Sequence, residues 1–163
     1  MLNGKELYEK EIITGNIPDK NVQQHGIDLN VKEIHSVIGF GEVSIKETKL
    51  PISLNVELMN DYWELDPGVY EIIFEQGCKV PADQMLLIRQ RSSLSRCGCM
   101  IASSIFDAGF ETNNIGTVMV VNAKVKIQKH SRIAQIYNHQ ASKVDNLYDG
   151  QFQNDKQRNN EED

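Results

Sequence analysis

The sequence between His35 and Arg91 most constrains the fold, because short apolar segments alternate there with turn signals about every ten residues. Segments such as 70–74 and 85–88 are rich in β-branched and aromatic or aliphatic residues and are too short for globular helices. The turn signals are Gly41, Asp66-Pro67-Gly68, Gly77 and Pro81-Ala82-Asp83. This pattern predicts an antiparallel β-sandwich or barrel and argues against a parallel α/β fold.

The flanking regions continue the pattern and add one helix. Ile27, Leu29 and Val31 alternate with polar residues, which indicates a strand, and residues 117–121, 124–127 and 132–137 form further strand candidates. At the N-terminus, Asn3 and Glu6 form a capping-box pair, so a helix is expected over residues 3–14, ending at Gly15 in a left-handed conformation.

Composition narrows the function classes. A chain of 163 residues predicts one domain, assigned to residues 1–153, followed by a polar tail at 154–163 that is expected to be disordered. The net charge of −6 argues against stable nucleic-acid binding, which needs dense Lys and Arg. No apolar run approaches the roughly 20 residues of a membrane span, and the charged start lacks a signal-peptide core, so a cytoplasmic setting without a membrane partner is expected. The odd number of cysteines predicts buried, reduced thiols.

Two segments carry candidate chemistry. Arg91, Ser92, Ser93, Ser95 and Arg96 offer guanidinium and hydroxyl donors that suit phosphate oxygens, although a solvated Ser/Arg turn is the ordinary alternative. Fifteen or so residues later comes Asp107-Ala108-Gly109-Phe110, where an ionised carboxylate at a turn can orient and deprotonate water. A turn-capping aspartate is the structural alternative for this acid. Asp28 faces away from Ile27 and Leu29, and on pattern alone a solvated surface acid is expected there.

These segments resemble the motifs of the dUTPase/dCTP deaminase superfamily over roughly residues 3–153. The segment that begins at Arg91 resembles the second motif of this superfamily, in the Arg-Ser-Ser-Leu version that one branch of dUTPases carries. The matching segments, in chain order, are Gly26-Ile27-Asp28-Leu29, Arg91-Ser92-Ser93-Leu94-Ser95-Arg96, Phe106-Asp107-Ala108-Gly109-Phe110, Arg132-Ile133-Ala134-Gln135 and Tyr148-Asp149-Gly150-Gln151-Phe152-Gln153.

The resemblance implies a mainly β chain, with a distorted antiparallel jelly-roll-like barrel or sandwich and a short N-terminal helix. It implies hydrolysis of dUTP to dUMP and pyrophosphate, in which Asp107 activates the attacking water and Asp28 helps to hold Mg²⁺ through water. It also implies a homotrimer with shared active sites. The residues assigned to the phosphates are Arg91, Ser92, Ser93, Arg96, Arg132 and Gln135. Those assigned to base and sugar are Gly109, Phe110, Tyr148, Phe152 and Gln153, of which residues 148–153 form a C-terminal lid.

Departures from the family pattern keep alternatives open. Phe110 and Phe152 stand where tyrosine is usual, and the hairpin at 111–115 is longer than usual, so the grip on the base is expected to be unusual. A dCTP deaminase, or a bifunctional deaminase and dUTPase, needs a glutamate on the following strand, where alignment on Gly116 places Val121. A non-catalytic nucleotide-binding regulatory module would need neither Asp28 nor Asp107.

Overall fold

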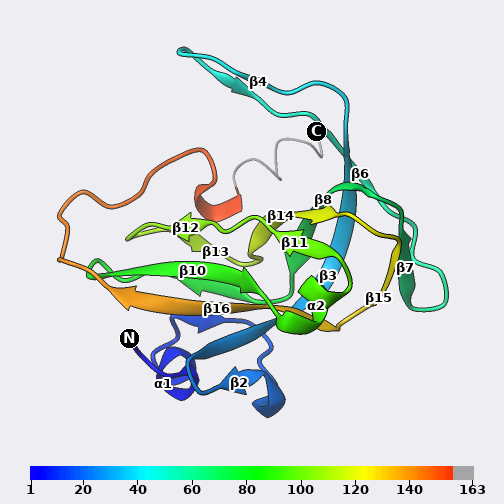
Figure 1. The fold of residues 1–163 in the computed structure, drawn as a ribbon. Coiled ribbons are helices and arrows are strands. Elements are labelled where there is room, and N and C mark those ends of the chain that lie inside the picture. The colour runs from blue at the N-terminus through cyan, green and yellow to red at the C-terminus, as the bar shows by residue number, and fades with distance from the viewer. Residues whose placement is uncertain (156–163) are drawn as a thin grey trace.

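The computed structural model describes residues 1–155 and is built almost entirely from antiparallel strands (Figure 1). The helical elements are α1 (Gly4–Glu9), η1 (Asp19–Asn21), α2 (Ser92–Arg96) and η2 (Gln153–Asp155). The strands are β1 (Ile13–Thr14), β2 (Val22–Gln23), β3 (Gly26–Ile38), β4 (Glu42–Val43), β5 (Thr48–Lys49), β6 (Ile52–Asn55), β7 (Tyr62–Leu65), β8 (Gly68–Phe74), β9 (Gly77–Lys79), β10 (Gln84–Gln90), β11 (Cys99–Ile101), β12 (Ile105–Phe106), β13 (Glu111–Thr112), β14 (Gly116–Val121), β15 (Val125–Gln128) and β16 (Arg132–Gln140).

The long strand β3 joins two halves of one curled sheet. Its first half pairs with β16, which continues to β10 and β12, and its second half pairs with β8, which continues to β14 and β11. The register of β3 shifts between Val31 and Glu33, where it passes from one partner to the other. Such irregularities bend a strand and increase its twist, which allows one sheet to wrap around a core. The expected antiparallel β fold is therefore confirmed.

The core lies between these two halves. Leu29, Ile34, Ile72, Phe74 and Met119 have no or almost no exposed surface, and they come from the three central strands β3, β8 and β14. Burial of each such side chain stabilises the fold by about 1.5–3 kcal/mol before entropy is counted. The strands that carry the candidate site are thus anchored in the best-packed part of the molecule.

The N-terminal helix is shorter than expected. The capping box of Asn3 and Glu6 is present, but α1 ends at Glu9, and Glu11 takes a positive φ of 52°. Ile13 then pairs with Cys78 in β1 and β9, so the prediction of a helix to residue 14 is wrong. The reason is tertiary: Ile12 and Ile13 are both buried, and a strand buries both against the core.

A hairpin of β4 and β5 extends away from the body (Figure 1). Its strands pair only with each other, and Phe40, Val43 and Ile45 on it are almost fully exposed. Two-stranded ribbons are marginal in water by themselves.

The cysteines are free thiols: Cys78 and Cys99 are buried as expected, whereas Cys97 is exposed because it follows the surface helix α2. Among residues 1–155, no helix has the length and apolar character needed to cross a membrane.

Candidate active site

Asp107 lies on a turn that backbone hydrogen bonds hold in place. Its carbonyl accepts from the Phe110 amide at 3.0 Å, and Val80 exchanges backbone bonds of 2.9 Å with Gly109 and Phe110. The side chain itself is exposed, and within the described residues its carboxylate makes no hydrogen bond or ion pair. A fixed backbone with an uncommitted carboxylate is the arrangement that a general base requires.

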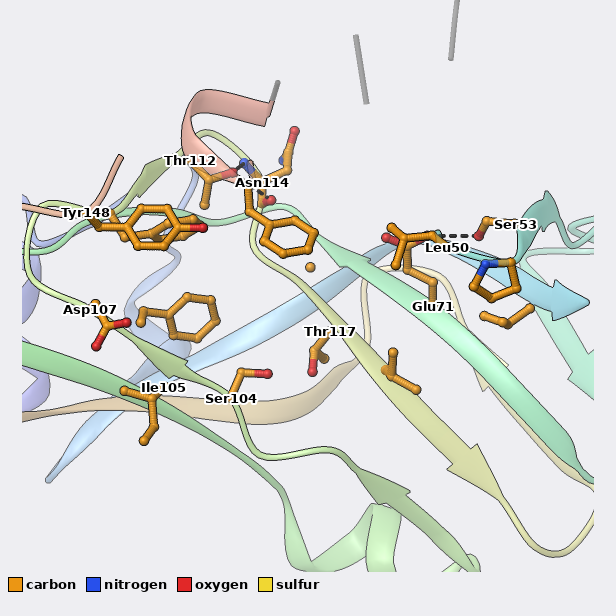
Figure 2. Close-up of a pocket in the computed structure, with 17 residues that line it drawn as sticks. Leu50, Ser53, Glu71, Ser104, Ile105, Asp107, Thr112, Asn114, Thr117 and Tyr148 are labelled. Carbon is orange, nitrogen blue, oxygen red and sulfur yellow. Dashed lines mark hydrogen bonds between the residues drawn. The ribbon is translucent and has the colours of Figure 1, made fainter. Parts of the chain in front are cut away.

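A pocket of about 490 Å³ opens beside this carboxylate (Figure 2). Phe106, Phe110 and Tyr148 form its aromatic wall near Asp107, with ring centroids of neighbouring pairs 5.4 and 5.5 Å apart. Thr117 lies on the floor and donates its hydroxyl to the Ala102 carbonyl at 3.0 Å. The volume and the mixture of apolar walls with a few polar groups are typical of small-ligand pockets.

The segment predicted to form a C-terminal lid, residues 148–153, is hydrogen-bonded to the Asp107 turn. The Tyr148 amide donates to the Ala108 carbonyl at 2.9 Å. The Gln153 amide group bonds at both ends, donating to the Gly109 carbonyl at 2.9 Å and accepting from the Glu111 amide at 3.0 Å. Phe152 lines the pocket and remains about half exposed.

A second cluster forms around Asp28. The carboxylate is only 1% exposed, because the face of β3 that carries it is covered, so the expectation of a solvated polar face is wrong. Its Oδ2 lies 3.3 Å from Nε of Arg91 and 3.2 Å from a guanidinium nitrogen of Arg132, and its Oδ1 accepts from Gln135 at 3.3 Å. Two predicted phosphate-binding arginines and the predicted glutamine therefore converge on one acid.

The remaining predicted phosphate contacts lie on α2. Ser92, Ser93 and Arg96 are exposed on this short helix, which directly follows Arg91. Their side chains make no hydrogen bond or ion pair within residues 1–155, so they are available to a ligand. The Arg91 amide donates to the Ile133 carbonyl at 2.8 Å, which fixes the start of this segment against β16.

Burial raises the pKa of Asp28, against the opposing effects of Arg91, of the Gln135 hydrogen bond and of Arg132. Two guanidiniums beside this carboxylate disfavour a resident divalent cation. Within the described residues, no group of three or more His, Cys, Asp and Glu side chains could hold a metal ion. Asp28 thus does not fit a metal site by itself; the water-mediated role stays a prediction, and the geometry adds that the acid orients Arg91 and Arg132.

The structure brings the predicted residues together in two separate groups. Asp107, Phe110, Tyr148 and Phe152 line the pocket, and Gly109 and Gln153, which are hydrogen-bonded to each other, lie beside it. The Asp28 cluster and α2 contribute no residue to that lining.

Sequence reasoning missed most of the other lining residues, among them Leu50, Pro51, Ser53, Glu71 and Thr117. Only the strand pairing of β6, β8 and β14 places them there, so no local motif could have revealed them.

The fold is shared with solved deoxynucleotide enzymes. A 2'-deoxycytidine 5'-triphosphate deaminase from Agrobacterium tumefaciens aligns with a TM-score of 0.66 at 15% identity, covering 86% of this chain and 47% of that chain. A mutant dUTPase of Staphylococcus bacteriophage 80alpha, solved with dUpNHpp, aligns with a TM-score of 0.52 at 14% identity, covering 86% and 90%. The chain thus shares the fold of these two solved enzymes.

The chain belongs to the dCTP deaminase-like family, whose model matches residues 4–141. Among curated relatives, the deoxyuridine 5'-triphosphate nucleotidohydrolase of Methanocaldococcus jannaschii is 31% identical over 139 residues, covering 83% of this chain and 88% of the relative. A protein of Methanosarcina acetivorans named as a probable enzyme of the same activity is 31% identical over 142 residues, covering 84% and 83%. The resemblance seen in the sequence motifs is confirmed.

Proposed function

We propose that this protein hydrolyses dUTP to dUMP and pyrophosphate. The observation that carries the proposal is Asp107. Its exposed carboxylate has no hydrogen-bond or ion-pair partner among residues 1–155, and it lies on a turn held by backbone hydrogen bonds beside an aromatic pocket. The names of the curated relatives support dUTP as the substrate. Nucleotide chemistry of this kind fits a cytoplasmic setting.

In the proposed reaction, Asp107 accepts a proton from a water molecule whose oxygen attacks the α-phosphorus. The bond between the α-phosphorus and the bridging oxygen breaks, and pyrophosphate leaves with that oxygen. Phe110 lies under the sugar, and Phe152 of the lid stacks on the base, a contact type worth about 1–3 kcal/mol. Lid closure over the Asp107 turn excludes bulk water from the reacting atoms.

We propose that Mg²⁺ enters with the triphosphate, as part of the substrate, since Asp28 is already paired with two arginines. The ion supplies neutralisation of charge that develops on the phosphate oxygens. The chain itself contributes hydrogen-bond donors to the phosphate oxygens. They are Arg91, Arg132 and Gln135, together with Ser92, Ser93 and Arg96 on α2.

We further propose a homotrimer in which each site is shared between copies. The division into two groups supports this, because the phosphate donors are absent from the lining of the Asp107 pocket. Exposed apolar residues on the outer sheet face, such as Val69 and Met100, also support association.

Mixing two inactive variants tests the sharing. Asp107→Asn and Arg91→Ala should each be inactive alone, but random trimers of an equal mixture should recover about a quarter of wild-type activity. Light scattering should give a trimer mass. A monomer, or a mixture without recovery, would contradict the shared site.

Analysis of the reaction products tests both the hydrolase proposal and the deaminase alternative. Val121, expected where a deaminase needs glutamate, is buried in the core and does not line the pocket. β14 gives the pocket Gly116, Thr117 and Val118, none of them acidic. Incubation with dUTP, dCTP, dTTP or UTP plus Mg²⁺ should therefore yield pyrophosphate from dUTP and no ammonia from dCTP. Intact dUTP after long incubation would remove the hydrolase proposal and favour a binding module.

A further inference from the structure

The pocket does not end where the proposed nucleotide site ends. From Asp107 it continues past Thr117 to a far end at Leu50, Ser53 and Glu71 (Figure 2). Val37, which pairs with Ser53, and Pro51, which follows Leu50, also line the pocket. The far end is formed by β3, by β6 and by the segment that leads from β5 to β6. It is therefore built by the sheet and by the base of the β4–β5 hairpin.

One carboxylate points into this far end. Glu71 lies on β8, opposite Val118 of β14 and His35 of β3 in the strand register. Its Oε2 accepts a hydrogen bond of 2.8 Å from the Ser53 hydroxyl, the bond drawn in Figure 2. His35 is directed to Glu33 instead, at 3.2 Å. Glu71 Oε1 has no hydrogen-bond or ion-pair partner within residues 1–155.

The surroundings make this oxygen a specific acceptor. Glu71 is half-buried, and its pocket neighbours Val37, Leu50, Pro51 and Val118 offer no side-chain donor. A carboxylate oxygen beside apolar walls loses hydration and gains most from an N–H or ammonium donor. Ser53 fixes the carboxylate's orientation, which leaves the second oxygen to a ligand.

We propose that Glu71 and Ser53 form a subsite for an amino-bearing substituent on the far edge of the pyrimidine. The inference rests on the proposed function, which places Asp107 at the α-phosphate, Phe110 under the sugar and Phe152 on the base. It adds that the far edge of this base faces Thr117, where the pocket continues. The ligand class is a deoxyuridine triphosphate with an amine-terminated group at ring carbon 5. The pocket beyond Thr117 and Val118 holds the linker, and Glu71 pairs with the amine.

A matched pair of substrates tests the subsite. 5-Propargylamino-dUTP and 5-propynyl-dUTP carry the same rigid linker and differ only in the terminal amine. Wild-type protein should hydrolyse the amine-bearing analogue with a kcat/KM about tenfold or more above that of the neutral analogue, as a charge-assisted bond predicts. Glu71→Gln should reduce this ratio to near one, and Ser53→Ala should reduce it in part. Glu64→Gln, the same change on the exposed face of β7, should leave the ratio unchanged.

The outcomes separate the subsite from the hydrolase proposal. If dUTP is hydrolysed but wild type does not distinguish the two analogues, or Glu71→Gln distinguishes them equally well, the subsite is overturned and the hydrolase stands. If dUTP is untouched, the hydrolase proposal is lost. In that case, calorimetry should measure the affinities of the same two analogues for Asp107→Asn, which tests the subsite without turnover. Equal affinities would overturn the subsite.

Discussion

Replacing Gly109 by alanine should undock the lid without unfolding the protein. Gly109 has a φ of +88°, and a Cβ at this position would lie 2.6 Å from the Leu147 Cβ and 3.0 Å from the Tyr148 amide nitrogen. Neither atom is the end of a flexible side chain, so the segment leading into residues 148–153 must move away.

The loss can be estimated from the contacts that hold the lid. They are three hydrogen bonds, from Tyr148 to Ala108 and from Gln153 to Gly109 and Glu111, with net values of about 0.5–1.5 kcal/mol each. The edge contact of Phe110 with Tyr148 adds about 0.5–1.5 kcal/mol. Losing roughly half of this, about 2 kcal/mol, lowers the closed population about 30-fold, and kcat/KM for dUTP should fall by about that factor.

Gly98→Ala is the matched control. Gly98 also has a positive φ, +81°, but a Cβ there meets only Ala123, with 3.2 Å to its Cβ, far in sequence from the lid. Both variants should lose about 1–2 kcal/mol from backbone strain and melt several degrees lower. Only Gly109→Ala should lose turnover and expose the chain after residue 147 to limited proteolysis. Equal turnover in the two variants would refute the lid assignment.

Three further predictions follow from the same geometry. Asp107→Asn should bind dUTP with near-normal affinity but lose about 10²–10⁴-fold in kcat, because the amide cannot accept the proton; a near-normal kcat in a steady-state assay would remove Asp107 from the mechanism. Deleting residues 147–163 should leave a folded protein with much weaker turnover of dUTP, whereas deleting 159–163 should change turnover little. The turnover of Phe152→Ala should lie between those of the long truncation and wild type, and that of Phe152→Tyr should be close to wild type. Full activity of the long truncation would contradict the lid. Because burial raises the pKa of Asp28, its contribution to stability is fully present below the unfolded pKa near 3.8 and is lost as pH rises through the higher folded value. As pH rises from 4 to 7, the free energy of unfolding measured in urea should therefore fall less for Asp28→Asn than for wild type. Parallel curves of this free energy against pH would contradict the reasoning.

The chemistry that could be predicted from the sequence lies in continuous segments. Asp107, Gly109 and Phe110 share one turn, and Ser92, Ser93 and Arg96 share one short helix, so local spacing already places them together. The antiparallel fold was equally predictable, since its signal is repeated in every short strand. The expected disorder of residues 154–163 falls mostly on 156–163, outside the described residues.

Residues brought together by strand pairing could not be predicted in the same way. Glu71 lies on β8 and Ser53 lies on β6, and only the pairing of both strands with β3 makes these two residues neighbours. The predicted end of α1 was wrong for a related reason, because the pairing of Ile13 with Cys78 on β9 requires the helix to end before Gly15. Local propensity is a weak guide wherever burial against a distant strand decides the conformation.

The Asp28 cluster depends on a single extra residue in β16. Gln135 pairs with Asp28, and a regular antiparallel register would then place Arg132 opposite Val31, on the other face of the sheet. The register instead shifts between Arg132 and Ala134, so that Arg132 pairs with Asn30 and shares the face of Asp28. The irregularity therefore turns a guanidinium from the core side onto the buried acid. Bulges occur often beside active sites because they re-aim a side chain in this way. Apolar periodicity cannot reveal such a shift, since Ile133 and Ala134 are both buried and read as an ordinary core strand.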